Sequence, residues 1–192
     1  MSSLVLSGDT SGSVALSVPT VSGTNTLTIQ AATGTNAING QGTAVATTSG
    51  TSVTFTDLPS WVKRITLMVS GVSTNAANNL IVQLGTSGGI VSTGYLSSLG
   101  VLNAGAGANT SATNGFLISS SNTASVVSGV ITITNLTSNT WVYSSVTKSA
   151  TTVVSMAAGD IALAATLTQI RLTDTAGTGV FDAGTVNILY EG

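Results

Sequence analysis

The sequence predicts an all-β protein in which an N-terminal extended β arm precedes a jelly-roll-like antiparallel β-sandwich. Two observations predict this class. The chain carries about eight to ten short runs of β-branched and aliphatic residues separated by Gly, Asn, Asp and Ser, as strands separated by turns do. In addition, no stretch has a convincing helical period of apolar residues. Closely spaced strands of this kind are typical of sandwiches and jelly rolls.

The composition is unusual in its lack of charge. Only 5% of the 192 residues are charged, against roughly 25% in ordinary soluble domains. The abundance of Val, Ile, Leu and Thr argues against disorder, which is built from charged residues and few β-branched ones. We therefore expect a surface made of Ser, Thr, Asn and Gly, or one that is buried against other chains. The net charge of −2 suits a subunit of an assembly.

Several classes of function are excluded or disfavoured by what the sequence lacks. It has no cysteine and no histidine, which removes disulfides, thiolate and histidine metal sites, and Ser-His-Asp or Cys-His catalysis. Its four Lys and Arg residues form no patch that could follow a nucleic-acid backbone. No 18-residue apolar run and no basic, apolar leader is present, so we expect neither membrane insertion nor a signal peptide. No cofactor and no metal are expected.

Residues 1–43 are predicted to form the arm and a linker. Residues 4–6, 14–18 and 27–29 are three β-prone pieces, and residues 31–42 have no periodicity, which is typical of a linker. Three such short strands bury little on their own, so their apolar side chains need a partner surface. The candidate anchoring and interface residues are Val14, Leu16, Val18, Leu27 and Ile29.

Residues 44–192 are predicted to form the sandwich. Residues 53–55 are a strand that runs into a corner at 57–59, and residues 61–69 form a central strand. Within that strand Ile65, Leu67 and Val69 share one parity, so we expect them to face the core.

The remaining elements follow in order along the chain. Residues 71–79 and 99–115 are predicted loops, rich in Gly, Ala, Asn and Ser, and residues 174–179 are a predicted turn. Further strands are predicted at residues 80–84, 90–96, 116–118, 126–136, 141–146, 152–156, 161–167 and 186–190.

Carboxylates are the remaining candidates for acid–base chemistry. Asp174 and Asp182 flank a turn, and Asp160 precedes a strand. Paired carboxylates can hydrolyse glycosides or bind calcium, but this spacing matches neither signature, and Asp at strand ends more often makes Asx turns. The structural interpretation is favoured. Lys63, Arg64 and Arg171 are expected to pair with Asp57, Asp174 or Glu191 and so to fix register or an interface.

Aromatic side chains could instead form a sugar-stacking surface. Tyr95 is expected to be a half-buried anchor, and Trp141 and Tyr143 share one parity of a strand. If that face were exposed, Trp141 and Tyr143 would form a ligand surface; the alternative ligand surface is Tyr95 with the loop at residues 99–115. Because the chain has few aromatic residues, a place in the core or in a subunit interface is the favoured interpretation.

The arm resembles a segment near the start of tailed-bacteriophage tail-fibre and other virion proteins. The matching pieces are residues 8–13 (GDTSGS), Pro19, residues 23–28 (GTNTLT) and residues 32–35 (ATGT). The later segments LPSWVKRITLMVSGVSTN, QLGTSGGIVSTGYLS and FDAGTVNILYEG are similar to a domain of phage and prophage structural proteins.

The resemblance implies a virion component, made in the cytoplasm of the bacterial host. We expect a non-enzymatic capsid-decoration, head-fibre or tail-fibre protein, a homo-oligomer and specifically a trimer, anchored to other virion proteins by its arm. The alternative is a module at a fibre tip that binds a carbohydrate or host receptor, and a host-surface glycan is its possible ligand. A hydrolase of cell-wall or capsule sugars using Asp174 and Asp182 is the third and least favoured hypothesis.

Overall fold

The computed structural model describes residues 3–7, 13–17, 38–103, 106–120 and 124–192. All secondary structure in these residues is β-strand, and the strands pair antiparallel. None of the described residues lies in a helix that could span a membrane. The chain divides into two compact units, residues 1–36 and residues 37–192. The predicted all-β class is therefore confirmed.

The first unit contains a hairpin. Strand β1 (Ser3–Ser7) pairs with β2 (Ser13–Ser17) over five residue pairs without a register shift. Of the five candidate anchoring residues, Val14 and Leu16 lie in β2. The other three lie outside the described residues, and these are Val18, Leu27 and Ile29.

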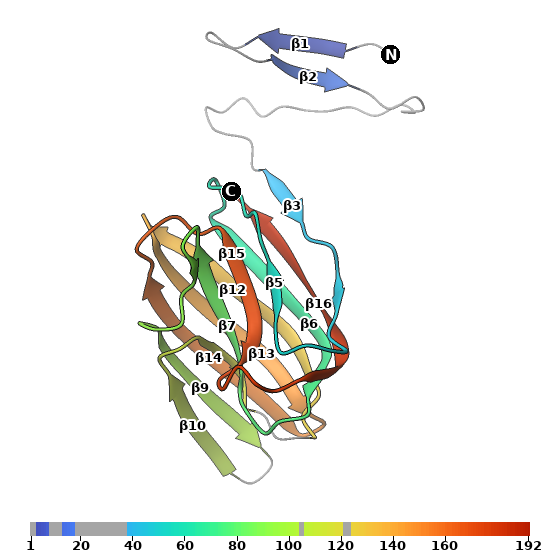
Figure 1. The fold of residues 1–192 in the computed structure, drawn as a ribbon, viewed down its shortest axis with the longest axis vertical. Coiled ribbons are helices and arrows are strands. Elements are labelled where there is room, and N and C mark those ends of the chain that lie inside the picture. The colour runs from blue at the N-terminus through green and yellow to red at the C-terminus, as the bar shows by residue number, and fades with distance from the viewer. Residues whose placement is uncertain (1–2, 8–12, 18–37, 104–105, 121–123) are drawn as a thin grey trace. The chain divides into compact units, whose positions relative to one another are not determined.

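The second unit is built around one large sheet (Figure 1). Along the sheet its strands run β10, β9, β14, β13, β12, β6, β16 and β3, with β4 also paired to β16. Their bounds are β3 (Asn39–Gln41), β4 (Val45–Ala46), β6 (Arg64–Thr74), β9 (Leu96–Asn103), β10 (Ala106–Ala112), β12 (Val127–Thr137), β13 (Thr140–Ala150), β14 (Val153–Ala162) and β16 (Phe181–Glu191).

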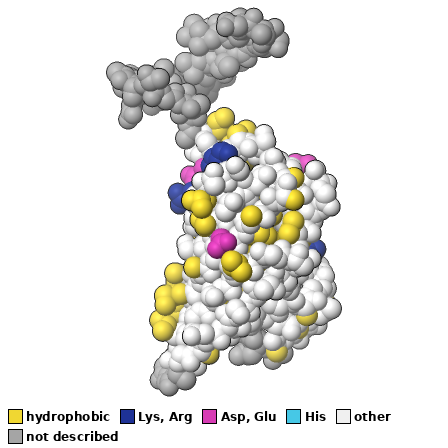
Figure 2. Space-filling view, turned by 90° about the vertical axis from the view of Figure 1, so that its left-hand side faces the viewer, with side chains coloured by type: hydrophobic (Ala, Val, Ile, Leu, Met, Phe, Trp, Pro, Cys, Tyr) yellow, Lys and Arg dark blue, Asp and Glu magenta, His cyan; other side chains and the backbone are white. Residues whose placement is uncertain are grey.

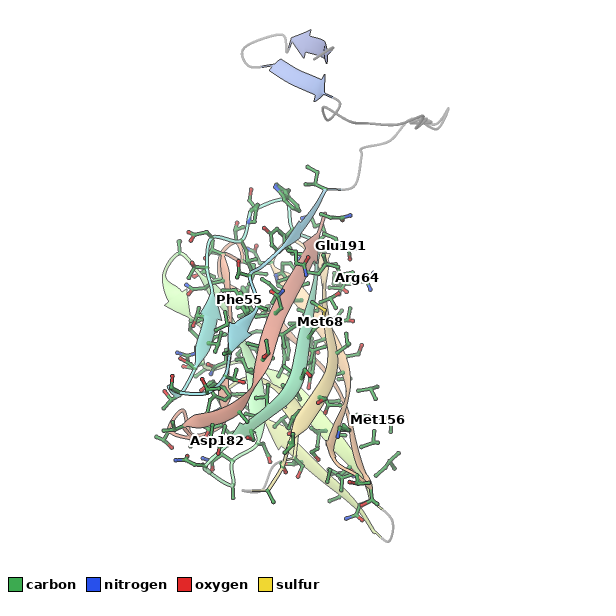
Figure 3. The ribbon with its side chains drawn as sticks, turned by 90° about the vertical axis from the view of Figure 1, so that its right-hand side faces the viewer. Phe55, Arg64, Met68, Met156, Asp182 and Glu191 are labelled. Carbon is green, nitrogen blue, oxygen red and sulfur yellow. The ribbon has the colours of Figure 1, made fainter. Side chains whose placement is uncertain are left out.

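A smaller sheet covers one face of the large one, which gives a sandwich-like arrangement (Figures 1 and 3). Its strands are β5 (Val53–Phe55), β7 (Leu80–Thr86), β8 (Gly89–Ile90), β11 (Phe116–Ser119) and β15 (Gln169–Asp174), in the order β11, β7, β15, β5 with β8 beside β7. The predicted jelly-roll connectivity is not confirmed by this order, because β12, β13 and β14 follow one another as neighbours in one sheet.

Strand β6 has the central place that its sequence predicts. It pairs with β12 on one side and β16 on the other. Ile65, Leu67 and Val69 are buried, and they lie opposite Tyr190, Ile188 and Val186 on β16. The alternation of apolar and polar residues therefore identified the inner face correctly. The corner before β6 is also present, since Val62 donates a backbone hydrogen bond to the carbonyl of Pro59.

Five segments differ from the sequence-based prediction. The predicted strands at 90–96 and 161–167 are wrong over most of their length, because residues 91–95 and 163–168 lie in no strand, and Asp160, expected before a strand, lies within β14. The other three segments form strands where loops or a linker were predicted. The predicted loop at residues 99–115 is wrong, because strands β9 and β10 pair there over seven consecutive residue pairs. The predicted loop at 71–79 begins too early, because β6 continues to Thr74. Residues 39–41, assigned to a linker, form β3 and pair with β16. In each of these three segments pairing with a neighbouring strand overrides the weak β propensity of Gly, Ala and Asn.

Candidate functional site

The aromatic residues proposed as a ligand surface lie in the core. Tyr95, Trp141 and Tyr143 have exposed fractions of 0%, 3% and 4%. Phe116 stacks on Tyr143 with ring centroids 4.1 Å apart and meets the edge of Tyr95 at 4.9 Å. The prediction of an exposed aromatic face is corrected accordingly: these rings fill the space between the two sheets, as the favoured interpretation expected, and Tyr95 is fully rather than half buried.

Hydroxyl groups join these rings to the edge of the small sheet. The Tyr143 hydroxyl donates to the Leu117 carbonyl at 2.9 Å, and the Leu117 amide donates to Ser97 Oγ at 2.9 Å. The Tyr143 and Ser97 oxygens are 2.7 Å apart. Because the single Tyr143 proton is used on the carbonyl, Ser97 is the donor to Tyr143. The three groups therefore form a closed ring of hydrogen bonds in the core.

The inward face of β13 supplies a further side-chain hydrogen bond to the backbone of β11. Thr147 Oγ1 donates to the carbonyl of Ile118, which is next to Leu117 on β11. Strand β11 pairs with β7 on one side only, so its other backbone edge would be unsatisfied in the core. Side-chain hydroxyls of the large sheet satisfy it. The sequence signal for these inward hydroxyls is the alternation of Ser and Thr with Val on β13. The same alternation is usually read as a strand whose Ser and Thr face solvent, so it did not identify the inward face.

Burial changes the acidity of both tyrosines. It raises the pKa of Tyr95 from 10.0 to about 12, against the smaller effects of the Leu84 hydrogen bond and the Arg171 charge. Burial also raises the pKa of Tyr143 to about 12, against the hydrogen bonds with Ser97 and Leu117. Both tyrosine hydroxyls are therefore harder to ionise in the folded chain than in the unfolded chain.

These shifts predict a loss of stability in alkali. Since the folded-state pKa lies above the unfolded value, the stabilisation is complete below pH 10 and is lost as the pH rises toward 12. A shift of this size is worth roughly 2–3 kcal/mol per group.

Urea unfolding of the wild type and of Tyr143→Phe at pH 8 to 12 measures this loss of stability. We expect the variant to be less stable at pH 8 but to lose about half as much stability with pH. Parallel pH profiles would contradict this.

Asp174 organises a turn. It is 2% exposed, and its carboxylate accepts bonds from the backbone amides of Ala176, Gly177, Thr178 and Gly179 and from the Asn78 side chain. Asp182 accepts a bond from the Ser73 hydroxyl. Both carboxylates are therefore used to hold backbone and side chains in place. Among the described residues, no group of three His, Cys, Asp or Glu could hold a metal.

In the part of the chain that the structure describes, the charged side chains make few ion pairs. Arg64 and Glu191 form an exposed salt bridge of 3.5 Å, at one end of the large sheet (Figure 3). Arg171 donates to Gln83 rather than to a carboxylate. Of the expected pairs, that between Arg64 and Glu191 is confirmed, and exposed pairs of this kind contribute little to stability.

The outer face of the large sheet, which the small sheet does not cover, is the strongest candidate for a functional surface. Val130, Val146 and Met156 lie directly opposite one another on adjacent strands, with exposed fractions of 49%, 60% and 45%. Half-buried Met68 continues the line on β6. We call these four residues the apolar row. It is about 14 Å long at the usual strand spacing, and Met156 projects away from the small sheet in Figure 3.

Beside the apolar row the same face is flat. The next outward residues toward the Arg64 end form a second line across the strands, which we call the small row: Thr66, Thr132, Ser144, Ala158 and Ser98. On β16 this line ends at half-buried Leu189, opposite Thr66. Where β9 and β10 meet β14, a shallow hollow of about 630 Å³ is lined by Ser98, Gly100, Asn109, Ser111, Met156 and Ala158, among others. The face thus has a ridge of large side chains next to a strip of small ones.

Comparison of the chain with protein-family models, with curated proteins and with solved structures finds no match.

Proposed function

We propose that the chain is a non-enzymatic structural protein of a phage virion. It would be a homo-oligomer, most simply a trimer, that serves as a capsid-decoration, head-fibre or tail-fibre component. Its first unit would be the anchor to other virion proteins, with Val14 and Leu16 of β2 among the contact residues. The resemblance of the sequence to phage virion proteins supplies the setting.

The observation that carries the proposal is the exposed apolar row on a nearly uncharged surface. Isolated exposed apolar residues are common, but three in register on adjacent strands make a continuous strip, and such strips mark contact surfaces. With 5% charged residues, the surface also has little to keep copies apart. Figure 2 shows a side of the molecule that is mostly neutral, with groups of hydrophobic side chains and few charges.

The use of Asp174 and Asp182, the two carboxylates of the hydrolase hypothesis, also supports a role without catalysis. Asp174 is occupied by the turn that it organises, and Asp182 by Ser73. A glycoside hydrolase needs a carboxylic acid and a carboxylate that face a substrate. A buried carboxylate held by backbone amides offers neither a free oxygen nor access.

The proposal is tested by the protein content of purified particles. We expect peptide mass spectrometry of gradient-purified phage to find the chain in many copies per particle, in a fixed ratio to the major capsid protein. Particles that lack the chain, while the host lysate contains it free, would contradict the proposal. The same measurement on particles from which the tails have been removed distinguishes the two locations: the chain remains if it belongs to the capsid and is lost if it belongs to the tail.

A second candidate is a glycan-binding module, and the hollow favours it. Asn109, Ser98 and Ser111 offer amide and hydroxyl groups there, which suit the hydroxyls of a sugar. A side chain at Gly100 would fill the hollow without a clash, because its Cβ would meet only Asn109 Oδ1 at 3.6 Å. Glycan-array binding that is lost in Gly100→Val would favour this candidate, and no binding by the wild type would remove it.

A further inference from the structure

The outer face of the large sheet is complementary to itself. The apolar row and the small row lie two residues apart along the strands, so large and small side chains alternate across the face. Two exposed leucines of β9 flank them: Leu102 lies one row beyond the apolar row, opposite Val154, and Leu96 lies one row beyond the small row, opposite Asp160. Both are more than half exposed, at 57% and 65%.

A two-fold axis between the two rows would use this pattern. Let the axis lie in the plane of contact, at right angles to the strands. Rotation about it reverses the strand direction, so the apolar row of each copy covers the small row of the other. The same rotation sets Leu102 of one copy over Leu96 of the second copy. Strands of the two sheets stay nearly aligned, which is a common way for sheets to pack.

The charges on the face fit the same arrangement. Within the apolar row, the small row and the row on either side of them, the charged described residues are Arg64 and Glu191, which pair with each other, and Lys148 and Asp160, which have no ion-pair partner within 4.0 Å. Lys148 lies opposite Val154 on β14, six residues from Asp160. At about 3.4 Å per residue the two are about 20 Å apart within one chain. After the rotation, Lys148 of one copy lies over strand β13 of the second copy. Asp160 of that second copy is on the neighbouring strand, β14, at the same level along the strands.

We propose that this face joins two copies of the chain through an isologous, two-fold contact in which Lys148 pairs with Asp160 of the second copy. Six strands and four rows cover roughly 29 by 27 Å, which gives roughly 800 Å² per copy, the usual size of a stable interface. In such a contact each interaction occurs twice. The inference is independent of the proposed function, and a two-fold contact can coexist with a trimer in a six-chain assembly.

The test is charge reversal in the full chain, read as mass by sedimentation equilibrium at about 10 μM. The wild type is expected to have the mass of an even number of 18.9 kDa chains. Lys148→Asp and Asp160→Lys each set like charges against one another, and each is expected to weaken the contact at least 10-fold and halve the mass. The double variant Lys148→Asp/Asp160→Lys restores opposite charges and is expected to regain the wild-type mass.

Matched controls separate this contact from general effects of charge. Lys63→Asp makes the same chemical change at an exposed site before β6 and is expected to keep the wild-type mass. Val146→Asp, in the apolar row, is expected to halve the mass, whereas Val45→Asp on β4 is not. A wild-type monomer or an odd-numbered oligomer, or a mass unchanged in Lys148→Asp and Val146→Asp, would overturn the two-fold contact. Absence from virions with this contact intact would contradict only the proposed function.

Discussion

Replacing Phe116 by alanine is expected to lower the free energy of unfolding by about 3–5 kcal/mol, the usual cost of removing a buried aromatic ring. The ring is fully buried and lies between Tyr143 and Tyr95. Its loss leaves a cavity at the point where the small sheet meets the large one. Two aromatic contacts, each worth roughly 0.5–1.5 kcal/mol, disappear with it. Urea unfolding followed by tryptophan fluorescence measures the change.

Two control variants separate the cavity from other causes. Phe116→Leu keeps most of the side-chain volume and is expected to lose less than half as much stability as Phe116→Ala. Val180→Ala removes an exposed apolar side chain that lies outside the apolar row and is expected to change stability by less than about 0.5 kcal/mol, as surface substitutions usually do. Equal losses in Phe116→Ala and Val180→Ala would contradict the placement of the core.

Asp174→Ala is expected to cost about 3 kcal/mol, because hydrogen bonds to charged groups are the stronger ones. The carboxylate accepts four backbone amides and one side-chain amide. Water can replace it at the exposed residues 176–178, but Gly179 is buried and its amide would lose its only acceptor there. Because water can replace some of these bonds, the expected loss of stability is smaller than the sum of the five hydrogen bonds.

Asp182→Ala is the matched control for this change. Its carboxylate is exposed and accepts one hydroxyl, so we expect a loss below about 1 kcal/mol. Asp174→Asn keeps the shape but replaces one acceptor oxygen with a donor, and we expect an intermediate loss. Chemical denaturation at pH 7 measures all three. A neutral Asp174→Ala would contradict the structural role assigned to this carboxylate.

The sequence predicted the parts of the fold in which one pattern decides the outcome. Ile65, Leu67 and Val69 alternate with polar residues over a long strand, so only one face can be buried. The turn after Asp174 followed from Asp and Gly at its ends. In both cases the local preference agrees with the tertiary contacts, so the adjacent residues in the sequence were sufficient to predict the structure.

The remaining features depend on segments far apart in the sequence. Strand β10 is rich in Gly, Ala, Asn and Ser, and β9 mixes Ser, Gly and Asn with Leu and Val, so neither shows a clear strand pattern. Strand β9 is held on one side by β14 and on the other by β10. On β13, Ser145 and Thr147 face inward while Val146 faces outward, the reverse of the usual pattern. Thr147 is inward because the edge of β11 needs a donor there. Such a requirement cannot be seen in the sequence of β13 alone.

The candidate site was predicted less well than the fold, for a related reason. Tyr95, Trp141 and Tyr143 attracted attention as rare aromatic residues, yet the scarcity that makes them conspicuous also makes them necessary in the core. The apolar row has no sequence signal of its own. Val130, Val146 and Met156 are ordinary residues in three strands, and only the register places them side by side.

A density map of the assembled phage particle tests the central claim most directly. It would show whether the chain is a component of the virion and what its outer sheet face contacts. The account predicts symmetry-related copies of the chain on the capsid or tail, with the apolar row buried against protein. Density that accounts for the whole particle without this chain, or copies whose apolar row faces solvent throughout, would contradict it.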